Sequence, residues 1–186
     1  QSGVYQVLGG QLVKFDLESR TYTETEYKND FKINSMGYAT SWDLIFGQAR
    51  ASGEDALGNP VQNGDIIAFD ATGAVYKVAE AEYGHYIGDM DDQGNLWTFS
   101  GGLGYAVRYD LSSLDADGGI TTTRFDLASS GIPTSGLADL AYNPTNQTFY
   151  GVASKGDGDA PGALVLVDIS QVAVGGDISI SYHDIS

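Results

Sequence analysis

The phrase Val165-Leu166-Val167-Asp168-Ile169 decides the fold, because three close copies of it occur earlier in the chain. The copies are Val13-Lys14-Phe15-Asp16-Leu17, Ile67-Ala68-Phe69-Asp70-Ala71 and Val107-Arg108-Tyr109-Asp110-Leu111. Their aspartates are separated by 54, 40 and 58 residues along the chain. Self-similarity at a spacing of this order is the signature of a protein built from structural repeats.

Each copy is flanked by two further apolar segments that predict strands. The segments that precede the copies are residues 4–9, 44–49, 96–101 and 149–153. The segments that follow them are residues 22–27, 75–79, 120–125 and 178–183. Apolar and variable residues alternate in the repeated phrase itself, which is the period of two expected for a β-strand. The aspartate then opens a turn, because its carboxylate can accept from backbone N–H groups two residues on.

A short additional strand is predicted before three of the repeats, at residues 38–41, 86–90 and 137–142, and the first repeat lacks one. The sequence therefore predicts an all-β fold, a β-propeller of four-stranded antiparallel blades, with about four blades in this chain. We expect one domain over residues 1–186, with repeats at 1–33, 34–84, 85–133 and 134–186. Three explanations fit the missing inner strand: imperfect closure of four repeats, a strand from another chain, or a larger ring.

Two stretches carry a resemblance to known propeller families. Residues 164–170 resemble the repeat of the LVIVD propellers of secreted and cell-surface proteins. Residues 89–99 resemble the Asp-x-x-Gly-x-Leu-Trp strand pair found in six-bladed propellers. Such motifs describe the geometry of a blade, so the resemblance implies a propeller fold and a cell-surface location, and it implies no reaction.

Composition limits the partners. The chain has 25 acidic and 9 basic residues and a net charge of −16, which repels phosphate backbones and argues against nucleic acid. No segment approaches the roughly 18–20 apolar residues of a membrane span, so we expect no membrane insertion. The absence of cysteine removes disulfides, thiol catalysis and thiolate metal sites.

A secreted, extracellular protein is the expected class. The chain starts at Gln1 without a methionine, as a chain does after removal of a signal peptide. Asn146-Gln147-Thr148 is a glycosylation sequon, so Asn146 is a candidate glycan acceptor.

Most candidate ligand-binding residues lie in two insertions between the second and third strands of their blades, and His85 stands just before an inner strand on the same face. The insertions, residues 51–63 and 155–162, are predicted to share one face of the propeller, and loops on a rigid scaffold commonly carry function. The candidates on this face are Glu54, Asp55, His85, Asp157 and Asp159. The repeat aspartates Asp16, Asp70, Asp110 and Asp168 are predicted to be structural and to lie on the opposite face.

One acidic stretch suggests a metal site. Residues 89–95 have the Asp-x-Asp start and the downstream glycine of calcium loops, without the final glutamate of an EF-hand. Asp89, Asp91 and Asp92 are therefore the candidate ligands, with calcium as the candidate cofactor. An ordinary turn rich in Asp, Gly and Asn explains the same residues.

Catalytic groups are sparse. The chain has two histidines, and no serine lies in a nucleophile-elbow motif. Asp43, Asp89 and Asp139 fall at comparable points of the inner strands, where enzymatic six-bladed propellers of the lactonase or strictosidine-synthase type carry axial carboxylates. The alternative role for these aspartates is to cap backbone amides of neighbouring strands.

Three functions remain open on this sequence. The first is a non-catalytic extracellular module for assembly, adhesion or protein interaction, in which a homo-oligomer or another chain completes the open blade. The second is a lectin-like propeller that binds a glycan or small ligand, helped by calcium. The third is a propeller hydrolase or lactonase with an axial carboxylate site.

Overall fold

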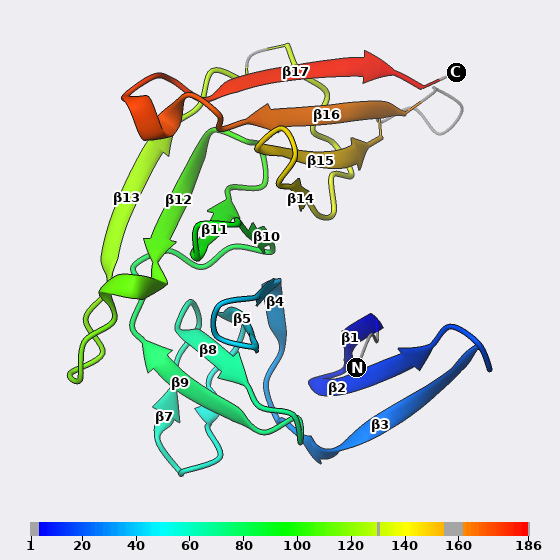
Figure 1. Ribbon diagram of the computed structural model, residues 1–186, viewed down its shortest axis with the longest axis vertical. Coiled ribbons are helices and arrows are strands. Elements are labelled where there is room, and N and C mark those ends of the chain that lie inside the picture. Colours follow the sequence, from blue (N-terminus) through cyan, green and yellow to red (C-terminus); the bar gives the residue numbers. More distant parts are fainter. Residues whose placement is uncertain (1–3, 130, 155–161, 186) are drawn as a thin grey trace.

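The computed structural model describes residues 4–129, 131–154 and 162–185 and contains four antiparallel sheets arranged as the blades of a β-propeller (Figure 1). The first blade has three strands: β1 (Val4–Leu8), β2 (Gln11–Asp16) and β3 (Thr21–Lys28). The second blade comprises β4 (Ile33–Ala39), β5 (Leu44–Ala49), β8 (Ile66–Phe69) and β9 (Val75–Ala79). The third comprises β10 (Ile87–Met90), β11 (Asn95–Phe99), β12 (Tyr105–Asp110) and β13 (Thr121–Asp126). The fourth comprises β14 (Ala141–Asn143), β15 (Thr148–Ala153), β16 (Ala163–Asp168) and β17 (Ser179–Asp184).

Smaller elements lie in the connections. The strands β6 (Gly53–Glu54) and β7 (Pro60–Val61) form a hairpin between β5 and β8. Two short 3₁₀ helices, η1 (Leu111–Ser113) and η2 (Val172–Val174), follow β12 and β16.

The predicted all-β propeller fold is confirmed, and the inner strands are the elements that the sequence placed least well. β4 begins at Ile33, the last residue assigned to the first repeat, and the predicted strand at 38–41 covers only its end. β14 starts at Ala141, so residues 137–140 of the predicted strand are loop.

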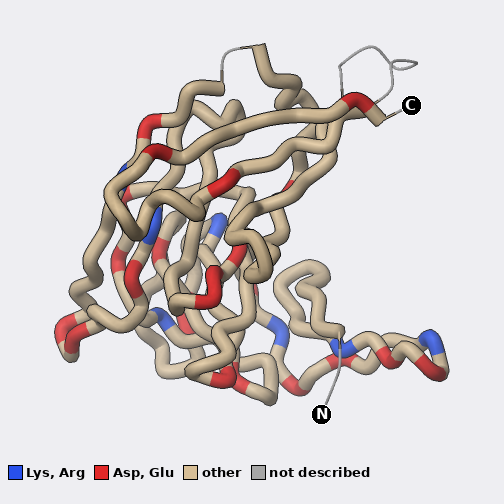
Figure 2. Tube along the Cα trace, turned by 45° about the horizontal axis from the view of Figure 1, so that its top comes forward, with Lys and Arg blue, Asp and Glu red and all other residues tan. Residues whose placement is uncertain are grey.

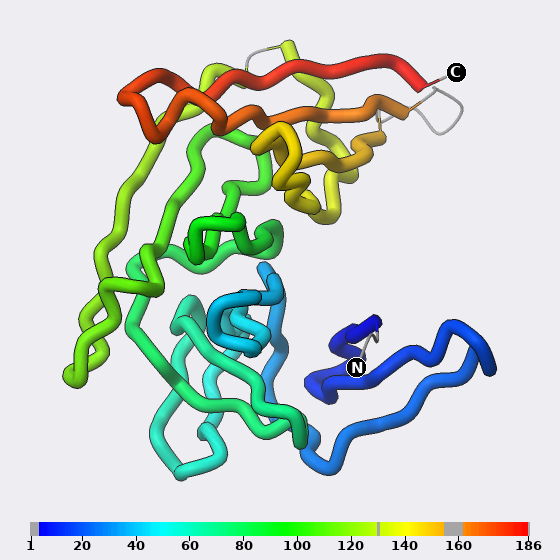
Figure 3. Tube along the Cα trace, viewed as in Figure 1, coloured from blue at the N-terminus to red at the C-terminus, as the bar shows by residue number. Residues whose placement is uncertain are grey.

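The four blades follow one another along an arc. Figures 1 and 3 show the first blade and the fourth blade at the two ends of this arc, with the inner strands toward its centre. β10 packs beside both β4 and β14, so the inner strands of the second, third and fourth blades are neighbours.

Each pair of consecutive blades buries its own apolar cluster. Leu12 and Phe31 pack with Phe69 between the first and second blades. A second cluster fills the junction of the second and third blades, and a third, which contains Trp97 and Phe149, fills the junction of the third and fourth. Both faces of the second and third blades are therefore buried, as expected for sheets packed face to face.

Charge is distributed without a basic surface. Figure 2 shows acidic residues along all four blades, with basic residues few and scattered among them. Within the described residues, no helix has the length and apolarity needed to cross a membrane.

The repeat aspartates close turns, as predicted. Each accepts a hydrogen bond on Oδ1 from the backbone N–H two residues on, namely that of Glu18, Thr72, Ser112 or Ser170. Each turn follows the next-to-last strand of its blade, which is β2, β8, β12 or β16. The phrase that reveals the repeat is therefore a turn motif, and it recurs because each blade ends its next-to-last strand in this way.

Replacing Asp110 by alanine should lower the free energy of unfolding by about 0.5–2 kcal/mol, because the side-chain acceptor for the Ser112 N–H and hydroxyl is lost. Urea denaturation measures the change. Asp126→Ala is the control, since the Asp126 carboxylate is exposed and pairs with Arg124, two residues away on β13. Equal stability of Asp110→Ala and the parent chain would contradict the structural role.

Candidate functional site

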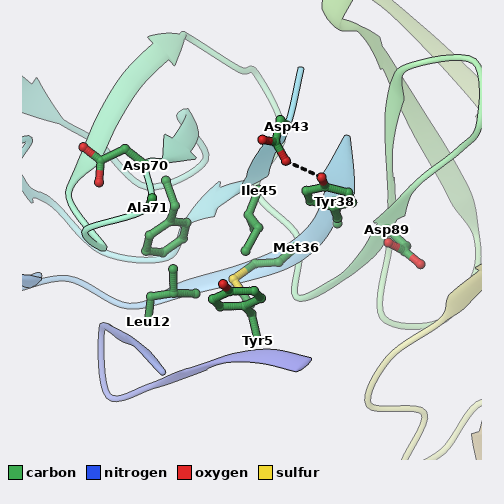
Figure 4. A pocket seen from close by; sticks show the side chains of 11 residues that line it. Tyr5, Leu12, Met36, Tyr38, Asp43, Ile45, Asp70, Ala71 and Asp89 are labelled. Atoms are coloured by element: carbon green, nitrogen blue, oxygen red, sulfur yellow. Dashed lines mark hydrogen bonds between the residues drawn. The ribbon is translucent and has the colours of Figure 1, made fainter. Parts of the chain in front are cut away.

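A cavity of about 670 Å³ lies between the first and second blades. Leu12, Met36 and Ile45 meet in it beside the ring of Tyr5, as Figure 4 shows. Carboxylates stand around this apolar centre, from Asp43, Asp70 and Asp89. The volume is that of ordinary ligand sites, which combine an apolar lining with a few polar groups.

The polar end of the cavity is a phenol–carboxylate pair. The Tyr38 hydroxyl donates to Asp43 Oδ1 at 2.5 Å (Figure 4). This hydrogen bond raises the pKa of Tyr38 above its ordinary value. Asp43 lies in the turn after β4 with φ of +54°, a conformation that aspartate tolerates better than most residues. Both side chains are held in place at the solvent side of the cavity.

β1, which contributes Tyr5 to the same cavity, has a free edge within the described residues. In the other three blades an inner strand pairs with the next strand, β4 with β5, β10 with β11 and β14 with β15. Within the described residues β1 pairs only with β2. An edge strand presents unpaired backbone N–H and C=O groups, and β1 also exposes Val4, Tyr5 and Leu8 by 43–48%. The cavity thus adjoins an apolar strand that has one unpaired edge.

Asp89 and Asp139 join the inner strands of the third and fourth blades. Asp89 Oδ2 accepts from the Tyr142 N–H at 2.8 Å, and Asp139 Oδ1 accepts from the Gly88 N–H at 3.3 Å. Each also accepts the N–H of the residue that follows it. These aspartates cap backbone amides of a neighbouring blade, which is the structural alternative to a catalytic role.

The axial carboxylates do not fall at comparable points, contrary to the prediction. Asp89 lies opposite Trp97 on β11, and the equivalent position of the second blade is Gly37. A Cβ atom at Gly37 would lie 2.5 Å from Asp89 Oδ1, so glycine there is what lets β4 approach the carboxylate. Asp43 occupies a turn and Asp139 a loop before β14.

Burial raises the pKa of Asp89 to about 6, with a further contribution from the charge of Asp139, while the N–H groups of Tyr142 and Met90 oppose the shift. The pKa of Asp139 is raised for the same main reason. The two carboxyls therefore hold protons more tightly than exposed aspartates do.

His85 is part of a buried hydrogen-bonded network between the second and third blades. Its Nδ1 lies 2.8 Å from Thr98 Oγ1 and its Nε2 lies 3.0 Å from the Tyr105 hydroxyl. Its backbone N–H donates to Gln48 Oε1. Burial, together with the nearby Arg50 charge, lowers the pKa of His85, so the ring is neutral at pH 7. Both ring nitrogens are engaged within the protein, away from the cavity at β1.

The candidate metal ligands point in different directions. Asp91 Oδ1 accepts from the N–H groups of Gln93 and Asn95, and its Oδ2 accepts from the Trp97 indole. Asp92 accepts from the Tyr142 hydroxyl. Among the described residues, no group of three or more potential ligands could hold a metal ion.

A five-residue Asp-x-x-Gly-x turn accounts for several of these carboxylates. Oδ1 of the aspartate accepts the N–H groups two and four residues on, and the glycine has a φ of +80° to +86°. The turn occurs at Asp55, Asp70, Asp91 and Asp115. In the sequence, the glycine three residues after the aspartate is the feature that indicates a turn at Asp55 and at Asp91.

The insertion at 51–63 folds back onto its own blade. The N–H of Ala56 donates to the Val75 carbonyl, and Asp55 Oδ2 accepts from the Lys77 N–H. Burial would raise the pKa of Asp55, but hydrogen bonds from Asn59, Lys77 and Leu57 lower it below its usual range. The tip of this insertion lies beside the start of β9, next to the Asp70 turn, so the prediction that the two lie on opposite faces is wrong here.

The remaining candidates are placed as follows. Glu54 is exposed on β6, and Asp157 and Asp159 lie outside the described residues. Asn146 is exposed in the turn between β14 and β15, and its side-chain amide donates to the Tyr150 hydroxyl. Neither Glu54 nor Asn146 lines the cavity at β1.

Comparison with known proteins gives the fold alone. No protein-family model and no curated protein sequence matches the chain. A virginiamycin B lyase from Staphylococcus aureus aligns with 96% of this chain and 50% of its own, with a TM-score of 0.52 and 10% identity. A chain of a nidogen/laminin complex aligns with 99% of this chain and 63% of its own, with a TM-score of 0.58 and 11% identity.

The present chain thus spans half of the lyase chain and 63% of the chain from the complex. Both alignments support a β-propeller, and they give no support to the LVIVD family in particular. At these identities the fold is what the chains share, and function has to be argued from the site.

Proposed function

We propose that this propeller is a non-catalytic protein-interaction module that accepts an extended strand of another polypeptide along the free edge of β1. The observation that carries the proposal is the combination of that edge with the adjacent cavity of about 670 Å³. β4, β10 and β14 occupy the corresponding place in the other blades, so a strand is the element that fits. Strand addition supplies backbone hydrogen bonds for affinity and side-chain pockets for specificity.

The chemistry of the cavity defines the strand. Side chains of an extended strand alternate between its two faces, so every second residue would enter the apolar centre around Leu12, Met36 and Ile45. A basic residue at the end near Asp43 and Asp70 would meet their carboxylates. The net charge of −16 favours encounter with a basic partner. The preferred partner is therefore an extended segment with alternate apolar residues and a lysine or arginine at one end.

The nidogen/laminin complex lends support, because a propeller of this fold takes part in a protein complex there. Asp89 and Asp139 are carboxylates that a hydrolase could use, but both accept hydrogen bonds that join the third and fourth blades. A structural role therefore explains them. The extracellular location remains a prediction of the sequence.

A fluorescent heptapeptide that alternates valine with threonine and ends in lysine should bind with a measurable Kd in an anisotropy titration. Replacing its central residue by proline should weaken binding about tenfold or more, since proline removes a backbone donor and is excluded from paired strand positions. A version that ends in glutamate should bind more weakly, because it places a like charge at Asp43.

Two variants of the chain make the assignment specific to β1. Tyr5→Ala removes a wall of the cavity and should weaken the peptide. Leu17→Ala removes an apolar side chain that is 71% exposed outside the cavity and should leave Kd unchanged. Equal binding of the parent and proline peptides, or no binding of either, would rule out strand addition.

A small ligand is the second candidate for the same cavity, because Tyr5 and Tyr38 are both exposed there beside the Asp43 carboxylate. Aromatic rings with a nearby hydrogen-bond acceptor can stack on and orient a sugar. Displacement of the labelled peptide by a simple mono- or disaccharide would favour this reading, and a saccharide panel without effect would exclude it.

A further inference from the structure

Arg50 is a partly buried cation that forms no ion pair with any described residue. It follows β5, and its guanidinium lies over the ring of Tyr86, with Cζ 3.9 Å from the ring centroid. Its Nε and Nη1 are buried and have no hydrogen-bond partner within the described residues. Arg50 also forms none of the ion pairs seen in that part of the chain. The chain has 25 acidic residues, so the absence of a carboxylate here is unexpected.

Arg124 is a stacked arginine of the same fold whose guanidinium also has a carboxylate partner. Its Cζ lies 4.0 Å from the ring centroid of Tyr105, nearly the same distance as for Arg50 over Tyr86. Arg124 also donates from Nε and Nη2 to Asp126 Oδ1 at 3.2 Å. The two arginines share the stacking geometry and differ in whether an anion is present.

The residues around Arg50 leave room for its side chain and add a second positive charge. A Cβ atom at Gly84 would lie 2.5 Å from Arg50 Nη1, so this glycine is what allows the guanidinium to approach the backbone. The Arg50 backbone N–H donates to the Lys32 carbonyl. A hydrogen bond from the Arg50 side chain and the Arg50 charge lower the pKa of Tyr86, and the charge of Lys32 adds a smaller contribution in the same direction. The positive charges of Arg50 and Lys32 therefore both act on Tyr86, which is exposed.

A cavity of about 380 Å³ lies next to the Arg50 site. It shares Gly84 and Tyr86 with the Arg50 site and continues along the apolar side chains of Ile87, Phe99 and Leu137. It is separate from the cavity at β1, because Arg50 and Lys32 lie at the opposite ends of β5 and β4 from Asp43 and Tyr38.

We propose that Arg50 and Lys32 form a binding site for an organic carboxylate, whose anionic group contacts the guanidinium and whose apolar part enters this second cavity. Buried guanidinium nitrogens without acceptors are costly, and a carboxylate supplies both a negative charge and acceptors for Nε and Nη1. Arginine is suited to this role, because its planar group stacks on a ring while its edges donate.

Benzoate is the probe, because it joins a carboxylate to a small apolar body. Benzoate, titrated at constant ionic strength, should raise the Tm of the wild-type chain and of Arg124→Gln. Arg50→Gln should weaken benzoate binding about tenfold or more, since a hydrogen bond to a charged group is worth about 1.5–3 kcal/mol. Benzyl alcohol, which has the same apolar body without charge, should not raise the Tm, and inorganic phosphate tests whether charge alone suffices.

The wild-type chain provides a second readout that needs no variant. In ¹⁵N spectra the Arg50 Nε signal should shift and saturate with benzoate, and the Arg124 Nε signal should stay in place. Assignment follows from the signal missing in each glutamine variant. A Tm rise of equal size in Arg50→Gln and wild type, or no saturable shift at Arg50, would overturn the proposal.

Discussion

Replacing Trp97 by alanine should lower the free energy of unfolding by about 3–5 kcal/mol, the usual cost of deleting a large buried aromatic side chain. Trp97 is 1% exposed and packs against Phe99, Phe125 and Phe149 at the junction of the third and fourth blades. Its indole N–H also donates to Asp91 Oδ2 at 2.7 Å. The truncation therefore opens a cavity and removes a partner from a buried carboxylate.

Two variants separate these contributions in urea denaturation. Trp97→Phe keeps an aromatic ring but loses the N–H, and should cost less than Trp97→Ala. Trp42→Ala removes the other tryptophan of the chain, which is 46% exposed, and should change stability by less than about 1 kcal/mol. Similar losses for Trp97→Ala and Trp42→Ala would show that the blade junction is not the main source of stability.

The stability of the chain should rise as the pH falls from 7 to about 5, because Asp89 has a raised pKa. A carboxyl with a pKa of about 6 in the folded state and 3.8 in the unfolded state binds its proton more tightly when folded. Its contribution is fully present below the unfolded value and is lost as the pH rises through the folded one. A shift of this size corresponds to about 3 kcal/mol as an upper limit.

Other aspartates limit this trend at lower pH. The pKa values of Asp16, Asp55 and Asp70 are lowered in the fold, so their contributions are lost as the pH falls through their folded values. Asp139 has a raised pKa and acts in the same direction as Asp89. Stability should therefore pass through a maximum on the acidic side of neutrality.

The Asp89→Asn variant tests whether Asp89 causes the pH dependence, through the slope of Tm against pH. Its Tm should change less between pH 7 and pH 5 than that of the parent chain, because the titrating group is gone. Asp126→Asn removes one negative charge from an exposed position and should keep the parent slope, which controls for the net charge of −16. An unchanged slope in Asp89→Asn would assign the pH dependence to other groups.

The local signals in the sequence were sufficient for the blades. The apolar phrase that ends in aspartate marked the next-to-last strand of a blade four times, and the aspartates cap their turns as expected. Both features depend on contacts between residues close in sequence, namely alternation along a strand and a hydrogen bond across two residues. Trp97 and Phe99, two residues apart on β11, both lie in the buried junction of the third and fourth blades, as alternation along a strand places them.

The inner strands and the sites needed the tertiary structure. The Asp89 to Tyr142 hydrogen bond spans 53 residues, and the contact of Gly37 with Asp89 joins two different blades. The stacking of Arg50 on Tyr86 and the return of the 51–63 insertion to β9 are likewise contacts between segments distant in sequence.

A propeller with an aspartate turn in every blade can be recognised from the amino-acid sequence, because alternation and turn motifs are local properties. The carboxylates shared between blades, the arginine without an ion pair and the cavity beside β1 could be found only in the folded chain. These features arise where separate blades pack, and the pairing of distant surfaces leaves no periodic pattern in a single sequence.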